Sequence, residues 1–249
     1  MFTPEERSRL RSTLLELAAS DQRIGGAAIT GSAASDREDR WSDIDLAFGV
    51  SNADDVAAVL LDWTDLVYKQ HRALHHLDVK AGAWTYRVFL LPSTLQVDLA
   101  FVPATEFRAL APTFRLVLGE AKEPAHVPPP SADSVIGSGW LYALHARSSI
   151  ARGKLWQAEY MISGVRDNAL VLACIRHGLA VTHARGIDQL PKEVTAKFEG
   201  SLVRQLSTAE LSRALAVVVR ALLSEIQNVD KELEGRLQGT LTHLSEIPR

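Results

Sequence analysis

The chain has 249 residues, of which 47% are hydrophobic and 23% are charged, with a formal net charge of -3 at pH 7. This length is enough to bury a sizeable core in one or two domains. The slightly acidic balance argues against a polymerase or a tRNA-adding enzyme, because proteins that grip a nucleic-acid backbone need a basic surface. The single cysteine, Cys174, lies in an apolar helical run and excludes an intramolecular disulfide. We interpret it as a small core hydrophobe.

The N-terminal segment predicts a helix rather than a targeting signal. Residues 1–6 are acidic where a secretory signal peptide is basic, and no apolar run in the chain reaches bilayer length. Thr3, Pro4 and Glu6 match a capping box with proline at the first helical position, which predicts a helix to about Ser20. We therefore expect a cytoplasmic protein that does not contact a membrane.

A short apolar strand leads into a glycine turn at Gly31-Ser32. Glycine lets the backbone approach a ligand closely, because it has no Cβ. The hydroxyl and backbone N–H of Ser32 are then available to a phosphate oxygen. This segment predicts a phosphate-binding turn.

Two aspartates follow on the next predicted strand, residues 43–48. Strand side chains alternate between faces, so Asp43 and Asp45 share one face while Ile44 and Leu46 pack inward. Carboxylates placed in this way are suitable oxygen ligands for Mg²⁺.

A third carboxylate, Asp98, lies on another alternating strand, residues 95–101. The preceding strand, 85–91, is joined to it by a predicted hairpin turn at residues 92–94. Asp98 is thereby placed in the same sheet as Asp43 and Asp45. Three such carboxylates can hold two metal ions about 3.5–4 Å apart, as two-metal phosphoryl chemistry requires.

The remaining segments of the first half are less distinctive. Residues 53–70 predict a helix, and residues 114–119 predict a last edge strand. Three histidines follow the helix without a clear metal-ligand spacing, so we interpret them as loop or interface positions; they are His71, His75 and His76.

A proline-rich segment, residues 124–132, predicts a linker between two domains. The domain before it, residues 1–123, contains every predicted strand. The domain after it, residues 133–249, has helical periodicity throughout, which predicts a bundle of helices with short loops. The expected helices span residues 133–152, 154–178, 191–204, 207–227 and 229–244. The expected fold is thus α+β, with a mixed sheet flanked by helices followed by an all-α bundle.

These motifs together resemble the signature of the polymerase-β-like nucleotidyltransferase superfamily. The resemblance rests on Gly31-Ser32, Asp43, Asp45 and Asp98, and it covers about residues 23 to 102. The size and the helical second half are most similar to the antibiotic nucleotidyltransferases, which adenylylate aminoglycosides or lincosamides. This resemblance implies a Mg²⁺-dependent transfer with two metal ions and with ATP as the default donor.

The resemblance also implies roles in the helical half. Arg152, Glu159 and Arg166 recur at seven-residue intervals and would share a stripe if the helix is continuous. In antibiotic nucleotidyltransferases, the helical domain commonly closes over the cleft and supplies a basic side chain to the triphosphate. By that likeness Arg152 or Lys154 binds the phosphates, and Glu159 or Asp98 is the general base. A solvated charged face is the alternative for this stripe.

The expected reaction is therefore transfer of a nucleoside monophosphate to a hydroxyl of a small molecule such as an aminoglycoside. Acidic residues that can line a site for a cationic acceptor are Asp78, Glu106, Glu159 and Asp167. Two alternatives remain open: a protein-modifying transferase of the antitoxin type, and a nucleotide-binding regulatory module without turnover. The acceptor, the nucleotide and the oligomeric state, monomer or homodimer, are not fixed by the sequence.

Overall fold

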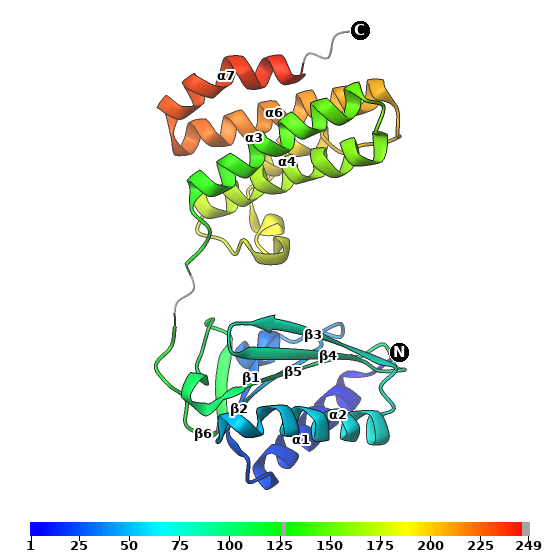
Figure 1. Ribbon diagram of the computed structural model, residues 1–249, viewed down its shortest axis with the longest axis vertical. Coiled ribbons are helices and arrows are strands. Elements are labelled where there is room, and N and C mark those ends of the chain that lie inside the picture. The colour runs from blue at the N-terminus through cyan, green and yellow to red at the C-terminus, as the bar shows by residue number, and fades with distance from the viewer. Residues whose placement is uncertain (126–127, 246–249) are drawn as a thin grey trace. The chain divides into compact units, whose positions relative to one another are not determined.

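The computed structural model describes residues 1–125 and 128–245. It divides the chain into two compact units, Met1–Val127 and Pro128–Arg249 (Figure 1). The division falls inside the proline-rich segment that the sequence marks as a linker. Among the described residues, no helix has the length and apolar composition that crossing a membrane requires.

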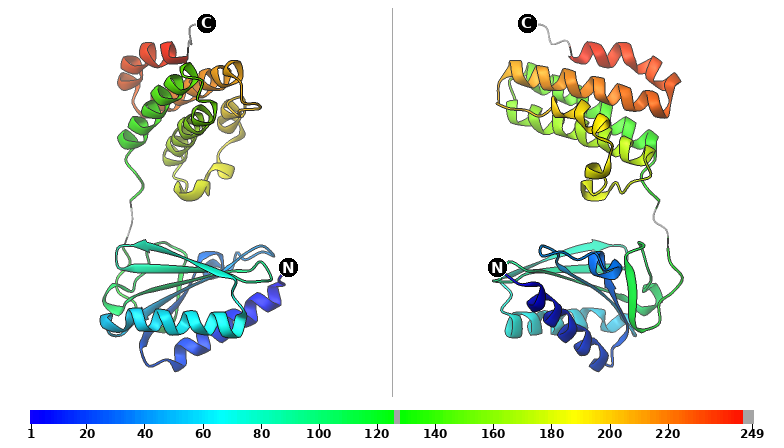
Figure 2. Two further views of the ribbon diagram at one scale, coloured as in Figure 1. Left: turned by 45° about the vertical axis from the view of Figure 1, so that its right-hand side comes forward. Right: turned by 180° about the vertical axis from the view of Figure 1, so that it is seen from behind.

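The first unit is built on a mixed six-stranded sheet with the order β3-β4-β5-β2-β1-β6. Its strands are β1 Ile24–Thr30, β2 Ile44–Val50, β3 His75–Ala81, β4 Trp84–Leu90, β5 Gln96–Pro103 and β6 Phe114–Gly119. The central strands β2 and β5 are parallel, and the other neighbouring pairs are antiparallel. Helices α1 (Pro4–Ser20) and α2 (Val56–His71) lie on the same side of the sheet (Figure 2). The α+β class predicted from the sequence is confirmed.

Helix α1 begins as its capping pattern predicts. The Thr3 hydroxyl accepts a hydrogen bond from the Glu6 backbone N–H at 3.2 Å, and the Glu6 carboxylate accepts one from the Thr3 N–H at 2.8 Å. Two backbone N–H groups of the first turn are thereby satisfied. The helix then packs Leu14 and Ala18 against the sheet.

The sheet has two chemically different faces because side chains alternate along its strands. One face packs against α1 and α2; there the rings of Phe48 and Trp63 are 4.6 Å apart between centroids. The opposite face, which we call the carboxylate face, carries a smaller apolar cluster around Phe107. Its buried members are Ala28, Ala47, Trp84, Ala100, Val102 and Phe107.

Strand β3 was not predicted from the sequence, from which His75 and His76 were interpreted as loop or interface positions. The strand lies at the edge of the sheet and pairs with β4 along its whole length. Six of its seven residues are exposed, so it lacks the buried alternation that marks a strand. The His76 ring lies on the helical side, where its Nδ1 is 3.0 Å from the Tyr68 hydroxyl.

The second unit consists of helices, as predicted. They are α3 Ala132–Ala151, α4 Leu155–Arg176, α5 Lys192–Glu199, α6 Thr208–Val229 and α7 Lys231–Ser245. The prediction for α5 was too long: this helix ends at Glu199, followed by Gly200 and a turn in which Ser201 N–H bonds the Phe198 carbonyl at 2.8 Å. Glu225 in the core of this unit has a fully buried side chain and pairs with Arg176 at 2.9 Å.

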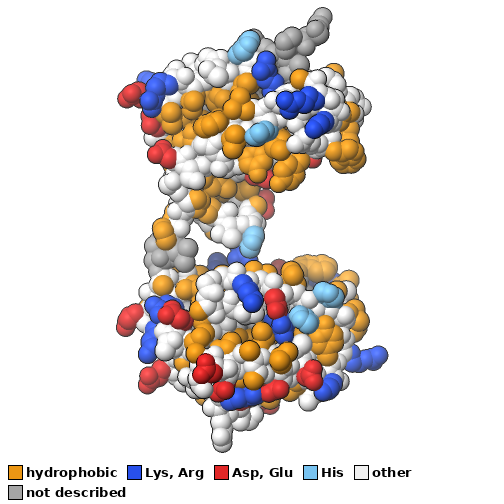
Figure 3. Space-filling view, viewed as in Figure 1, with side chains coloured by type: hydrophobic (Ala, Val, Ile, Leu, Met, Phe, Trp, Pro, Cys, Tyr) orange, Lys and Arg blue, Asp and Glu red, His pale blue; other side chains and the backbone are white. Residues whose placement is uncertain are grey.

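Surface charge in the first unit is mixed in sign. On the face seen in Figure 3, acidic and basic side chains are interspersed with hydrophobic ones.

Candidate active site

The three aspartates of the first unit lie on the carboxylate face. Asp45 on β2 and Asp98 on β5 are register partners in the parallel pair, so they are direct neighbours across the sheet. Asp43 immediately precedes β2 and is two residues from Asp45. The expected placement of these side chains on one face of one sheet follows from β2 and β5 being adjacent and in register.

Asp98 is the most unusual of the three carboxylates. Its Oδ1 atom is buried and has no hydrogen-bond partner. Burial, followed by the negative charge of Asp43, raises the pKa of Asp98 to about 6. A buried acceptor without a partner costs free energy, so this position is poorly explained by folding alone.

Asp43 is held at the edge of the same group. Its Oδ2 atom accepts a hydrogen bond from Gln96 Nε2 at 3.1 Å. Gln96 is the first residue of β5, two residues before Asp98. Gln96 therefore couples Asp43 to the strand that carries Asp98, and the sequence analysis did not identify it.

Gly31 is fixed in place by two independent requirements. Its φ of +62° lies in the left-handed region, and a Cβ at this position would collide with the Asp45 Oδ2 atom. Gly31 and Ser32 begin a short 3-10 helix, Gly31–Ser35, directly after β1. The predicted glycine turn is thus in contact with one of the predicted metal ligands.

The carboxylates fit a divalent cation, although the predicted cluster is not preformed. Within residues 1–125 and 128–245, no three His, Cys, Asp or Glu side chains are close enough together to hold a metal ion. Asp98 Oδ1 is buried without a partner, and the negative charge of Asp43 acts on Asp98. A bound cation would give this oxygen a partner and would offset the repulsion between the two carboxylates. All three side chains are carboxylates, and carboxylate oxygen is the ligand type that Mg²⁺ prefers.

Tyr86 also belongs to this face and was missed by the sequence analysis. It pairs with Ala100 in the β4–β5 register, two residues along from the pair of Val88 and Asp98. Burial, and then the negative charge of Asp98, raises the pKa of the Tyr86 hydroxyl. The alternation of β4 would have identified this residue, because Tyr86 and Val88 share a face.

Two acidic residues expected to line an acceptor site are engaged elsewhere. Asp78 pairs with Arg87, with its Oδ1 2.7 Å from Nε, on the helical side of the sheet. Arg87 also donates to the Thr64 hydroxyl on α2, so this pair joins the edge of the sheet to the helix. Glu106 pairs with Arg108 at 3.2 Å. The prediction for Asp78 is wrong, because its side chain is on the face opposite Asp98.

In the second unit, the predicted charged stripe is interrupted. Arg152 is the C-cap of α3, Gly153 has a φ of +68°, and Lys154 is the N-cap of α4. Arg152 and Glu159 therefore do not lie on one continuous helix, so the condition for a shared stripe is not met at Arg152. Arg152 and Lys154 instead lie together in the exposed turn between the two helices.

Glu159 and Arg166 do lie on one helix, and Ser163 connects them. The Ser163 hydroxyl donates to Glu159 Oε1 at 2.8 Å, and Arg166 Nη2 donates to Ser163 Oγ at 2.8 Å. Arg166 Nη1 also donates to the Ser201 carbonyl at 3.2 Å. Burial raises the pKa of the adjacent Asp167, and Arg166 opposes this shift.

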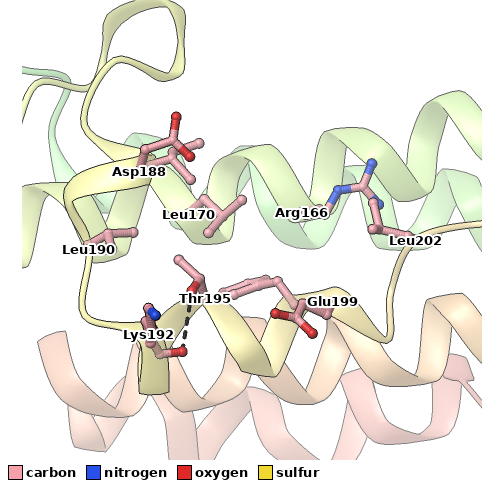
Figure 4. A pocket seen from close by; sticks show the side chains of 10 residues that line it. Arg166, Leu170, Asp188, Leu190, Lys192, Thr195, Glu199 and Leu202 are labelled. Carbon is pink, nitrogen blue, oxygen red and sulfur yellow. Dashed lines mark hydrogen bonds between the residues drawn. The ribbon is translucent and has the colours of Figure 1, made fainter.

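Arg166 also lines a cavity of about 460 Å³ between α4 and α5 (Figure 4). The apolar part of its wall comes from Leu170, Leu190 and Phe198. Charged side chains at its margin are Arg166, Asp188, Lys192 and Glu199. This cavity contains none of the residues that the motifs predicted for nucleotide binding.

Comparison with known proteins gives structural similarities only. No protein-family model matches the sequence, and no significant match was found among curated proteins. The chain is similar in structure to an aminoglycoside 6-adenyltransferase from Bacillus subtilis. The TM-score is 0.43 with 12% identity, over 98% of this chain and 99% of that one.

A second solved structure is the polymerase core of TRAMP, an RNA surveillance complex, with a TM-score of 0.32 and 13% identity. The similarity covers 90% of this chain and 59% of that chain.

Proposed function

We propose that the protein is a Mg²⁺-dependent nucleotidyltransferase that moves a nucleoside monophosphate, AMP from ATP by default, to a hydroxyl of a small molecule. The observation that carries this proposal is the adjacency of Asp45 and Asp98 on parallel strands, with Asp98 Oδ1 buried and without a partner. Neither the fold nor the hydrophobic core needs such an arrangement, whereas phosphoryl transfer does.

Each residue of the carboxylate face then has a role. Asp43, Asp45 and Asp98 would hold the divalent metal, which supplies charge neutralisation and alignment of the triphosphate when bound. Gly31 and Ser32 would contact the outer phosphates through the turn after β1. Gln96 positions Asp43 through its 3.1 Å hydrogen bond.

The reaction is a displacement at the α-phosphorus. The acceptor oxygen forms a bond to this phosphorus while the bond to the bridging oxygen of the pyrophosphate breaks, and pyrophosphate leaves with that electron pair. The hydroxyl proton passes to Asp98, the carboxylate on the same face. Glu159 is the alternative base, and Arg152 and Lys154 are the candidate phosphate-binding cations of the second unit.

Two other functions differ from this proposal in measurable ways. An antitoxin-type transferase would label a protein instead of a small molecule. A regulatory module would bind nucleotide without turnover. The Asp98 oxygen without a partner favours an active transferase over such a module. We propose a cytoplasmic enzyme that binds no membrane or nucleic acid and acts as a monomer or homodimer, with antibiotic resistance as a physiological role.

The test is pyrophosphate release from ATP and Mg²⁺ with a panel of small hydroxylated acceptors that includes aminoglycosides and lincosamides. Asp43→Asn is the matched variant, because the amide keeps the size of the side chain and its ability to accept from Gln96. Release that needs an acceptor and disappears in Asp43→Asn supports the proposal. Release that persists in the variant would refute the metal assignment.

A further inference from the structure

An exposed apolar surface lies next to the carboxylates on the same face of the sheet. We call it the apolar shelf, and it consists of Leu77 and Val79 on β3 with Val88 and Leu90 on β4. Leu77 is 61% exposed, while Val79 and Leu90 are each 48% exposed. Exposed aliphatic side chains gathered beside a polar site mark a surface that contacts something else.

Strand register places the shelf beside Asp98. Leu77 pairs with Val88, Val88 pairs with Asp98, and Asp98 pairs with Asp45. These four residues form one row across the carboxylate face, because register partners in a sheet point to the same side. A molecule that reacts at the carboxylates and extends toward β3 therefore lies on the shelf.

The geometry of the proposed displacement at the α-phosphorus indicates which substrate lies on the shelf. Gly31 follows β1, which flanks β2 on one side, whereas β5, β4 and β3 lie on the other side of β2. In phosphoryl transfer, the attacking and leaving oxygens are roughly in line. If pyrophosphate leaves toward Gly31 and Ser32, the acceptor enters from the β5–β4–β3 side, over the shelf.

Among the described residues of β3 and β4, no carboxylate shares the face of the shelf. The charged side chains in the middle of β3 and β4, Asp78 and Arg87, are paired with each other on the helical side of the sheet. Ammonium groups over Leu77 and Val79 would lose water without gaining a carboxylate, which is unfavourable. An alkyl or aryl group there would instead bury apolar area against aliphatic side chains.

We infer that the acceptor is an alcohol with an apolar body, an alkyl or aryl group that lies on Leu77, Val79, Val88 and Leu90 while its hydroxyl faces Asp98. This inference rests on the proposed function and narrows its substrate class, away from polycationic aminoglycosides.

The experiment compares acceptors of increasing alkyl chain length with aminoglycosides in the pyrophosphate-release assay, using the full chain. Each added methylene that reaches the shelf should lower the acceptor KM about fourfold, from the free energy of burying one CH₂ group. The double variant Leu77→Thr/Val79→Thr should raise the acceptor KM roughly tenfold while leaving the KM for ATP unchanged. Threonine is chosen because it keeps strand propensity and adds a hydroxyl.

Leu61→Gln is the control variant, because Leu61 lies on α2 and is 65% exposed, close to the exposure of Leu77. It should leave every kinetic constant unchanged. Three outcomes overturn the inference. The acceptor KM does not change with alkyl chain length, or the double variant raises the KM for ATP instead of the acceptor KM. In the third, the double variant has a lower free energy of unfolding than the wild type, which would show that the shelf packs against protein.

Failure of the proposed function has a different signature. In that case no acceptor of either class supports pyrophosphate release, and calorimetry detects no binding of ATP with Mg²⁺. If only aminoglycosides support pyrophosphate release and the double variant does not change it, the proposed transferase function stands and the apolar acceptor is refuted.

Discussion

Asp45 and Asp98 face each other across the only parallel pair of strands in the described sheet, with α2, β3 and β4 in the chain between them. Their carboxylates lie on the face opposite the helices, one against Gly31 and the other with a buried oxygen that has no partner. The contact of Asp45 with Gly31 leads to the first prediction, and the buried oxygen of Asp98 leads to the second.

Gly31→Ala should disrupt the site more than a second glycine substitution with the same backbone strain. Both Gly31 and Gly82 have φ near +60°, but a Cβ at Gly82 meets nothing within 4 Å, whereas one at Gly31 meets the Asp45 carboxylate. Gly82→Ala should cost about 1–2 kcal/mol of unfolding free energy from the left-handed backbone. Gly31→Ala should cost more and also abolish calorimetric ATP binding; equal costs with binding retained would contradict the contact.

Asp98 should make the metal-free protein less stable as the pH rises. Its pKa is about 6 when folded against an ordinary value of 3.8. Between these values the unfolded chain has lost the proton that the folded chain keeps, so the free energy of unfolding falls as pH rises from about 4 to 6. At pH 7.5, Asp98→Asn should be more stable than the wild type by on the order of 2 kcal/mol, given partial exposure.

The measurement is urea unfolding in EDTA at pH 4 and pH 7.5. At pH 4 the two proteins should be similar in stability, because Asp98 is protonated in the folded wild type. Added Mg²⁺ at pH 7.5 should stabilise the wild type more than Asp98→Asn. A variant that is less stable than the wild type at pH 7.5 in EDTA would show that the carboxylate has a stabilising partner.

Glu159→Gln distinguishes the two candidate bases. If Glu159 accepts the proton, turnover should fall by roughly 10²–10⁴-fold with the KM for ATP unchanged, as loss of a general base predicts. An unchanged turnover assigns the role to Asp98. Ser163→Ala is the matched control, because it removes the hydroxyl that Glu159 and Arg166 share while keeping both charges; steady-state kinetics of the three proteins separates the cases.

The pair of Arg176 and Glu225 should control the stability of the helical unit. Glu225 has no exposed side-chain area and its Oε1 is without a partner, so removal of Arg176 leaves a buried charge. Arg176→Met should cost about 3–5 kcal/mol in urea unfolding. The double variant Arg176→Met/Glu225→Leu should recover most of this loss, and failure to do so would attribute the cost to packing instead of charge.

The central strands and the first helix were predictable from the sequence because their signals are local. Apolar residues on either side of Asp45 and Asp98 mark β2 and β5 as strands, and Thr3 with Glu6 marks the start of α1. Strand β3 gave no such signal, because both its faces are largely exposed and its pairing with β4 depends on backbone hydrogen bonds.

The sequence predicted which residue types occur at the candidate site, but it did not predict which of these residues lie next to one another. Register across different strands decides that Asp98 meets Asp45, that Gln96 reaches Asp43 and that Val88 and Leu77 continue the row. Spacing along one segment carries no information about register between segments. In the helical half, Gly153 has a positive φ and lies between α3 and α4, so Arg152 is not on the helix that carries Glu159 and Arg166. Seven-residue spacing alone does not reveal this break.

The parallel pairing of β2 with β5 also has a kinetic consequence. Parallel neighbours cannot be joined by a tight hairpin, so Asp45 and Asp98 meet only when a long loop containing α2, β3 and β4 has closed. Contacts of high contact order form slowly, since the entropy of loop closure is lost before they stabilise the chain. No nascent chain that ends before β5 can assemble the carboxylate pair, so Asp45 and Asp98 meet only with global folding of the first unit.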